Sequence, residues 1–406
     1  MYWANFFHIY QPPNWSKEII KKVAKESYRP LLKILKKNPT FKITLNLSGS
    51  LTEQLADQGY TDIINDIKKL AGRQQIEMVE SAMYHPILPL LPEAEIIRQI
   101  NLNHHQNKKY FGKNYHPTGF FPPEMAFSEK MGKIVEKMGY KWIIADEIVA
   151  YGQLGKIYFD SVYKIKGQRI KLVFRNRYLS DYISFHSQIK KPEDFWKQIA
   201  IDGRSKFSVI TAMDGENLGH HRKKLDLYWK FLLKSNYKKI VTVSELLKKY
   251  KKTEIITPHP ASWSSQEDEL KRGVPYALWE DKNNPIHFYQ WKLLNEVIKL
   301  VNDNRRHEEY PLARAMLDQA LASDQFWWAS AKPWWSLDII REKIAEIARI
   351  PSILQTKPGS IEKTALKVVN LAEQWQKTGR YNKISEQYLK RFDTVRYIGG
   401  KKVASH

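Results

Sequence analysis

Polar and acidic side chains follow five short apolar runs of this sequence, each where the run ends. The positions are His8 with Gln11, Glu80, Glu124, Asp146 with Glu147, and Asp214 with Glu216. If the runs are parallel strands of a barrel, their carboxyl ends meet at one rim, where barrels build their active sites. One carboxylate after a strand is weak evidence, because loops often carry acidic residues. Five such positions on one chain indicate a site.

Glu124 and Asp214 are the strongest candidates for catalysis. Glu124 follows two prolines, whose rings fix the backbone just before it. A carboxylate that caps a helix predicted from Ser128 fits Glu124 equally well. Asp214 ends the apolar run FSVITAM and precedes a glycine, which also fits a plain Asp-Gly turn.

Two carboxylates that face one cavity are what glycoside cleavage requires. One attacks the anomeric carbon, and the other protonates the departing oxygen and then deprotonates water. In a retaining enzyme the two groups lie ~5–5.5 Å apart. The proton donor must keep its proton near neutral pH, so we expect burial and the neighbouring carboxylate to raise the pKa of Asp214.

Tryptophan is concentrated late in the chain, where eight of the thirteen follow residue 262. Indole faces can stack on sugar rings, but tryptophan is usually a buried core residue. Trp291 and Trp375 stand at helical spacing, and we expect both in the core. The segment FWWASAKPWW places four tryptophans among polar and proline residues. Four such side chains are hard to bury together, so we expect at least one to contact substrate.

The first two thirds of the chain alternate strand-like and helix-like segments, which predicts a parallel sheet with right-handed crossovers. The predicted strands are Trp3–Ile9, Phe41–Leu47, Ile76–Glu80, Gly119–Pro122, Trp142–Ala145, Ile170–Phe174, Ser208–Met213 and Ile240–Val243. The predicted helices are Ser16–Lys37, Leu51–Leu70 with Ser50 as N-cap, Glu93–Tyr110, Ser128–Met138, Pro192–Ile201 and Arg222–Leu233. Seven or eight such units indicate a barrel.

The pattern changes to helices alone after about residue 285. The predicted helices there are Phe288–Asn302, Pro311–Ala322, Leu337–Ala348, Ile361–Thr378 and Ile384–Phe392. We therefore expect a catalytic barrel over residues 1–285 and a helical domain over residues 286–406 that contributes to the active site.

Composition limits the alternatives. The 406 residues are 43% hydrophobic and 27% charged, as in a globular protein. There is no cysteine, which excludes disulfides and thiolate metal sites and is consistent with a cytoplasmic location. The sequence contains no run of ~20 apolar residues, so no membrane-spanning helix is predicted. The start MYWANFFHIYQPP indicates a buried strand rather than a signal peptide.

The net charge of +23 could favour binding to nucleic acid. However, the lysines are dispersed in short helical runs, and the sequence contains no recognised nucleic-acid-binding motif. We favour a lysine-rich surface without a nucleic-acid partner. The sequence gives no indication of the oligomeric state.

Seven motifs in order along nearly the whole chain resemble glycoside hydrolase family 57. They are HIYQPP, RQQIEMVESAMYHPILPLL, GFFPPEMAFSE, FRNRYLSDYISF, ITAMDGENLGHH, HPASW and ALASDQFWWAS. The resemblance implies an α/β fold, an incomplete (β/α)7 TIM-like barrel followed by a C-terminal helical bundle. It also implies a retaining mechanism without metal or cofactor.

The resemblance also implies roles for individual residues. Glu124 would be the nucleophile and Asp214 the general acid/base. The substrate contacts would be His8, Gln11, Glu80, Glu216, His221, Trp263, Asp324 and Trp327, and the FRNRYLSDYISF motif would contribute Arg175 and Asp181. We expect His8, Gln11 and Glu80 to hydrogen-bond the sugar of the covalent intermediate.

Three residues depart from the family's pattern. Tyr10 replaces a histidine, His221 stands where many members carry tryptophan, and Ala261 replaces a glycine. Because the catalytic pair is intact, the departures concern specificity more than activity, although a non-catalytic carbohydrate-binding homologue stays possible. A metal-dependent polysaccharide deacetylase would need an early aspartate pair and a His-x3-His motif, and the sequence has neither.

Hydrolysis and transfer share the same glycosyl-enzyme and differ in whether water or a sugar hydroxyl reaches it first. We expect an α-1,4-glucan hydrolase of the α-amylase type. The alternative is a 4-α-glucanotransferase.

Overall fold

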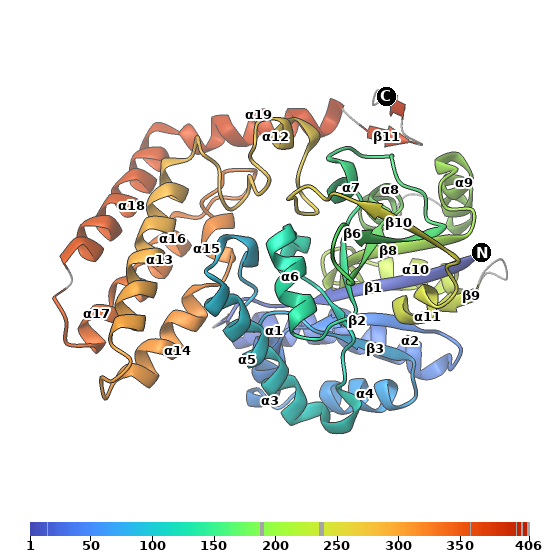
Figure 1. The fold of residues 1–406 in the computed structure, drawn as a ribbon, viewed down its shortest axis with the longest axis horizontal. Helices are drawn as coiled ribbons and strands as arrows, with labels where there is room; N and C mark the ends of the chain where they lie inside the picture. The colour runs from blue at the N-terminus through green and yellow to red at the C-terminus, as the bar shows by residue number, and fades with distance from the viewer. Residues whose placement is uncertain are drawn as a thin grey trace. The chain divides into compact units, whose positions relative to one another are not determined.

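The computed structural model describes residues 1–13, 15–186, 191–234, 239–357, 359–394, 396–398 and 401–403 (Figure 1). The chain forms two compact units. The first contains Met1–Met83 and Leu88–Trp263, and the second contains Tyr84–Ile87 and Ser264–Arg396. The division between Trp263 and Ser264 comes earlier than the predicted boundary at residue 285, because the segment before the first long helix belongs to the helical unit.

Seven parallel strands form the barrel of the first unit. They are β1 (Tyr2–Ile9), β2 (Ile43–Leu47), β3 (Ile76–Val79), β4 (Gly119–Phe120), β5 (Trp142–Asp146), β7 (Lys171–Arg175) and β8 (Ser208–Asp214). One ladder has the order β3-β2-β1-β8, and the other contains β7-β5-β4.

Two narrow seams join these ladders into one curved sheet. At the first seam the Phe121 N–H donates to the Glu80 carbonyl oxygen at 2.8 Å, and the Glu80 N–H donates to the Gly119 carbonyl oxygen at 3.0 Å. At the second seam the Asn176 N–H donates to the Ile210 carbonyl oxygen at 2.8 Å. The predicted incomplete (β/α)7 barrel is confirmed.

Three further strands lie around the barrel. The short β9 (Lys239–Val241) pairs with the beginning of β1. β6 (Ser161–Ile165) runs antiparallel to β7, and β10 (Lys252–Ile256) pairs with β6. Neither β6 nor β10 was predicted from the sequence. Most of β10 is exposed, so it lacks the apolar run by which the buried strands were found.

Helices cover the outside of the barrel. They are α1 (Lys17–Val23), α2 (Arg29–Lys37), α3 (Gly49–Asp57), α4 (Thr61–Gly72), α5 (Glu93–Phe111), α6 (Glu129–Lys137), α7 (Ile148–Tyr151), α8 (Arg177–Asp181), α9 (Pro192–Asp202), α10 (Leu225–Lys234) and α11 (Val243–Leu247). A π-helical turn, Ala24–Tyr28, joins α1 to α2. The helix predicted over Leu51–Leu70 is two helices, α3 and α4, separated by Gly59 at φ 80°. Its N-cap is Ser48 rather than Ser50, because the Ser48 hydroxyl accepts the Leu51 N–H.

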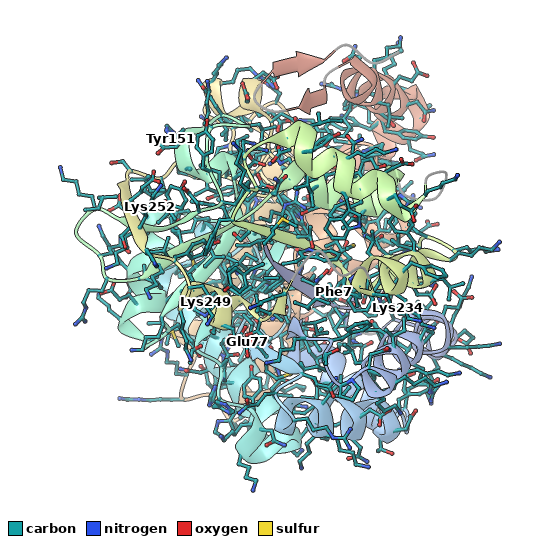
Figure 2. The ribbon with its side chains drawn as sticks, turned by 90° about the vertical axis from the view of Figure 1, so that its right-hand side faces the viewer. Phe7, Glu77, Tyr151, Lys234, Lys249 and Lys252 are labelled. Atoms are coloured by element: carbon teal, nitrogen blue, oxygen red, sulfur yellow. The ribbon has the colours of Figure 1, made fainter. Side chains whose placement is uncertain are left out.

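Alternation along the strands separates two cores. On β1, Trp3 and Phe7 pack with the outer helices, whereas Ala4 and Phe6 belong to the barrel interior. Phe7 lies deep in the first unit in Figure 2, while Lys252 on β10 extends from its edge. The labelled lysines are exposed, as expected for dispersed lysines: Lys234 ends α10, Lys249 lies in the turn after α11, and Lys252 begins β10.

The second unit is helical. It contains α12 (Glu267–Lys271), α13 (Pro285–Asp303), α14 (Tyr310–Ala320), α15 (Asp324–Trp327), α16 (Leu337–Ala348), α17 (Ile350–Ile353), α18 (Gly359–Thr378) and α19 (Arg380–Thr394). The short strands β11 (Arg396–Ile398) and β12 (Lys401–Val403) pair with each other, and most of their residues belong to the first unit. The long helices α13, α16 and α18 pack together (Figure 1). Trp375 is buried in this unit as predicted, whereas Trp291 is half-buried and stacks on Phe326 with ring centroids 4.2 Å apart.

Within the described ranges, the helices are all too short or too polar to cross a membrane.

Candidate active site

Strand periodicity directs four polar side chains into the barrel. Side chains two residues apart share a face of a strand. Interior residues of the barrel include Phe6 on β1, Ile144 on β5, Val173 on β7 and Ala212 on β8. The residues two positions later at these strand ends are His8, Asp146, Arg175 and Asp214. These four therefore point to the inner side of the rim.

Glu124 occupies a tight turn after β4. Its φ of 59° and the φ of 48° at Met125 are left-handed values, which are uncommon for residues with a Cβ and cost roughly 1–2 kcal/mol each. Surrounding contacts hold this turn. The backbone N–H of Trp263 donates to the Glu124 carbonyl oxygen at 3.1 Å. Phe127 and Ala261 exchange two backbone hydrogen bonds of 2.8 and 3.2 Å. Ala261 is thus a buried backbone partner of the loop that carries Glu124.

Trp263 binds the Glu124 side chain directly. Its indole Nε1–H donates to Glu124 Oε2 at 2.7 Å. A hydrogen bond donated to a carboxylate favours its ionised form and fixes its orientation. The Trp263 ring also meets Phe121 edge-on, with centroids 6.0 Å apart. Trp263, which was predicted to contact sugar, therefore also donates a hydrogen bond to the predicted nucleophile.

Arg175 connects Trp263 to acidic residues of β5 and α8. Its guanidinium lies 5.4 Å from the Trp263 ring centroid, and Nη2 donates to the Trp263 carbonyl oxygen at 3.3 Å. Arg175 Nη1 lies 3.5 Å from Asp181, and Nε donates to Asp146 at 2.7 Å. Arg177 also pairs with Asp146, at 2.7 Å.

Asp146 is a buried counter-ion for these arginines. Burial by itself would raise the pKa of Asp146, but the positive charges of Arg177 and Arg175 outweigh burial and hold that pKa below its usual value. Asp146 therefore stays ionised and fixes both guanidinium groups. Arg177 and this role of Asp146 were not predicted, because neither follows from residue spacing.

Asp214 has the environment of a proton donor. Burial raises its pKa to about 6, although the positive charge of Arg175 opposes the shift. In the parallel register of β1 and β8, Asp214 stands beside His8. A carboxyl group with this pKa keeps its proton into the mildly acidic range, as a general acid needs.

Glu216 lies in the short 3-10 turn after β8 and is also buried. Burial and then the charge of Asp214 raise its pKa to about 8. Its Oε1 accepts hydrogen bonds from Tyr28 Oη at 2.5 Å, Tyr10 N at 3.1 Å and Gln11 Nε2 at 3.3 Å. Gln11, predicted to contact substrate, is here a partner of Glu216. Tyr10, one of the three departures, contributes through its backbone.

His8 is held as a neutral imidazole. Its Nδ1 lies 2.7 Å from Asn46 Oδ1, and Asn46 Nδ2 donates to the Val79 carbonyl oxygen, so the Asn46 oxygen must accept from His8. Burial lowers the His8 pKa to about 4 despite this bond. The ring stacks on Phe121 with centroids 4.5 Å apart.

Glu80 does not fit its predicted contact with the sugar. Val79 faces the barrel interior and Met78 the outer helices, so Glu80 faces the helices. Its carboxylate is fully buried and accepts from Asn103 and Tyr115 on one oxygen and Tyr140 on the other, while His104 Nδ1 lies 2.8 Å from that second oxygen. Both oxygens are thus occupied by the protein. The sequence pattern located the end of β3 correctly but could not give the direction of a side chain just beyond it.

His221 lies on the loop after β8. Its backbone N–H donates to the Glu216 carbonyl oxygen at 2.9 Å. Desolvation, followed by the charges of His220 and Arg222, lowers the pKa of this exposed side chain to about 4. The contact of His221 with substrate stays a prediction.

Asp324 and Trp327 belong to α15 of the second unit. Trp327 packs against Trp328 and Trp334, with centroids 5.2 and 4.8 Å away. All four tryptophans of FWWASAKPWW retain some exposure, which for Trp334 reaches 45%. The expectation that they cannot all be buried is confirmed. The roles of Asp324 and Trp327 toward substrate stay predictions.

In the part of the chain that the structure describes, no three His, Asp or Glu side chains are grouped as ligands for a metal ion.

Comparison with known proteins identifies the family. Residues 3–259 match the family model for glycosyl hydrolase family 57. The chain belongs to glycosyl hydrolase family 57. The matched region ends within the first unit and contains Glu124 and Asp214.

Two similar curated family members have different names. An α-amylase of Pyrococcus abyssi is 23% identical over 354 residues, covering 79% of this chain and 53% of that protein. A 4-α-glucanotransferase of Thermococcus litoralis is 22% identical over 354 residues, with the same coverage. The chain spans about half the length of these relatives or less.

Solved structures show the same fold. A branching enzyme of the family from Thermococcus kodakaraensis matches with a TM-score of 0.69 at 16% identity, covering 92% of this chain and 94% of that one. The Thermococcus litoralis 4-α-glucanotransferase matches with a TM-score of 0.67 at 18% identity, covering 86% and 60%.

Proposed function

We propose that this protein cleaves α-1,4-glucosidic bonds with retention, using Glu124 as nucleophile and Asp214 as general acid/base. The supporting observation is the contrast between their environments. Glu124 accepts a hydrogen bond from an indole N–H, which favours the carboxylate, whereas burial raises the pKa of Asp214 to about 6 and favours the acid. One ionised and one protonated carboxyl group are the starting state of retaining cleavage.

The first chemical step is displacement at the anomeric carbon. The Glu124 carboxylate attacks that carbon while the Asp214 carboxyl group transfers its proton to the departing glycosidic oxygen. The products are a glycosyl ester of Glu124 and the released glucan end. Trp263 holds the attacking carboxylate in place, and the left-handed turn at Glu124 is fixed by its backbone partners, so little rearrangement is needed during attack.

The second step reverses the roles. Asp214, now a carboxylate, removes a proton from water or from a sugar hydroxyl, and that oxygen displaces Glu124. Water gives hydrolysis, and a glucan hydroxyl gives 4-α-glucanotransfer. We place hydrolysis first. The transferase is the second candidate because an α-amylase and a 4-α-glucanotransferase match the chain with nearly equal identity.

Incubation with maltoheptaose and chromatography of the products tests this proposal. Shorter sugars alone are expected for the hydrolase. Shorter and longer sugars together would indicate the transferase. An unchanged maltoheptaose pool, with a folded protein, would contradict activity on α-1,4-glucans.

A further inference from the structure

The π-helical turn Ala24–Tyr28 has no role in the chemistry described above. A π-turn is rare and is often found at functional sites, because the i→i+5 bond inserts one extra residue into the helix. Here the Arg29 N–H bonds to the Ala24 carbonyl oxygen, which closes that wider turn. Ala24, Ser27 and Tyr28 are buried.

Three consecutive residues of this turn contact the loop after β8. Glu26 pairs with His220 at 2.6 Å, and Ser27 Oγ donates to the Gly215 carbonyl oxygen at 2.7 Å. Tyr28 Oη donates to Glu216 at 2.5 Å. The loop begins directly after Asp214, so the turn is bonded to both ends of the segment that follows the predicted acid/base.

Gly219 shows how closely the two segments approach. Its φ is 101°, and a Cβ built there would lie 2.3 Å from the Glu26 carbonyl oxygen. Such a distance is shorter than any van der Waals contact, so a larger residue would push the loop away from the turn.

We propose that the π-helical turn is a positioning device for the acid/base, and that Tyr28 is the positioning residue that acts on Asp214 through Glu216. This inference rests on the proposed function, because it assumes that Asp214 donates the proton. Tyr28 touches neither substrate nor the reacting atoms in this account. It orients Glu216 and sets how readily Glu216 carries a negative charge beside Asp214.

The electrostatic consequence has a definite sign. The groups that face the pair are Tyr28 from the turn, Tyr10 N and Gln11 after β1 and Arg175 from β7, with the neutral His8 on β1. The Tyr28 hydroxyl favours ionised Glu216, whereas burial and the charge of Asp214 oppose ionisation and raise the pKa of Glu216 to about 8. Removing the hydroxyl should raise the pKa of Glu216 further. Glu216 already holds its proton where Asp214 titrates, so the pKa of Asp214 should stay near its parental value, and the loss is one of orientation.

The test compares Tyr28→Phe with the parent on two substrates. Malto-oligosaccharides have a poor leaving group, so their cleavage needs the general acid. α-Maltosyl fluoride has a good leaving group and does not need the acid. The kcat/KM on α-maltosyl fluoride therefore reports the nucleophile alone. For Tyr28→Phe we expect kcat/KM on maltopentaose to fall by about tenfold, with kcat/KM on the fluoride within about twofold of the parent. The alkaline limb of the maltopentaose profile should keep its position, because Glu216 is already protonated where Asp214 titrates.

Tyr163→Phe is the matched control. It removes another buried tyrosine hydroxyl, which bonds the Tyr158 backbone outside the site, and should leave the ratio of kcat/KM on the two substrates unchanged. Ser27→Ala should show a smaller selective loss on maltopentaose, which keeps the test available if Tyr28→Phe folds poorly.

The outcomes separate the two claims. A parent enzyme without activity on either substrate would overturn the proposed function and this inference with it. The proposed function is supported if the parent is active and its Asp214→Asn variant loses activity on maltopentaose but keeps activity on α-maltosyl fluoride. If Tyr28→Phe and Ser27→Ala then keep the parental ratio of kcat/KM on the two substrates, or lose activity on both substrates equally, the positioning role alone is wrong.

Discussion

The two sides of the barrel rim treat the same chemical group in opposite ways. After β4, Glu124 is fixed by a left-handed turn and receives an indole N–H. After β8, the half-buried Asp214 lies beside the buried Glu216, and desolvation raises the pKa of Asp214 to about 6. The hydrogen-bond donor on one side and the desolvation on the other agree with the proposed roles of Glu124 as nucleophile and Asp214 as acid. Residue type alone could not make that assignment.

Removing each carboxylate is the largest test of this contrast. Glu124→Gln should lower kcat/KM on both maltopentaose and α-maltosyl fluoride by about 10⁴-fold or more, because attack is lost for any leaving group. Asp214→Asn should lower kcat/KM on maltopentaose by about 10²–10⁴-fold but leave the fluoride nearly unaffected. Initial rates on both substrates measure the split. Exposed Glu129→Gln at the start of α6 is the control. Equal losses for both variants on both substrates would contradict the assignment.

Substitution of Trp263 sharpens the β4 side of the comparison. Trp263→Phe keeps an aromatic ring but removes the donor to Glu124, and a hydrogen bond to a charged group contributes about 1.5–3 kcal/mol. We expect kcat/KM to fall by roughly 10–100-fold on both substrates, because the nucleophile serves both. Trp291→Phe is the matched control. It removes an indole N–H that donates only to a backbone carbonyl oxygen, that of Trp279, at 2.9 Å. A Trp263 effect confined to maltopentaose would mean that the ring acts through sugar binding instead.

Glu80 tests whether a buried carboxylate at a strand end must be functional. Its oxygens are fully occupied by side chains of the helix layer. Glu80→Ala should therefore lower the free energy of unfolding by about 3 kcal/mol, because several buried donors lose their acceptor. Urea denaturation measures this change. At a temperature where the variant is folded, kcat/KM should stay within about threefold of the parent. A loss of orders of magnitude in the folded variant would restore the predicted sugar contact.

The smallest expected effect is on stability at the β8 side. Because the folded-state pKa of Asp214 is above its usual value of 3.8, the folded protein holds the proton while the unfolded chain releases it. Stability therefore falls as pH rises from about 4 to about 6. Asp214→Asn should remove part of this slope and stabilise the protein at pH 7 by about 1 kcal/mol. Unfolding curves at pH 4 and pH 7 measure it, and an unchanged slope would mean that Asp214 is well solvated.

The sequence predicted the barrel well because its strands are buried on both faces. Seven barrel strands appear as short apolar runs, whereas the exposed β10 has no such pattern. The positions of Glu124 and Asp214 followed from strand ends and family motifs. The partners of these residues did not, because Tyr28 reaches Glu216 from 188 residues away in sequence, and Trp263 reaches Glu124 from 139 residues away. Contacts that depend on tertiary packing have no local signal.

Side-chain direction was the other limit. His8 and Asp214 continue the alternation of their strands, so their inward orientation could be inferred. Glu80 stands just past the end of β3 with the opposite parity, and only the structure shows its helix-side network.

The most direct test is to trap the covalent intermediate. A 5-fluoro-α-glucosyl fluoride forms a glycosyl-enzyme quickly and releases it slowly, so intact mass followed by peptide mapping identifies the attacking residue. The account predicts a single added sugar on the peptide that contains Glu124, and no label in Glu124→Gln. Label on another carboxylate, or turnover of α-glucans by Glu124→Gln at the parental rate, would contradict it.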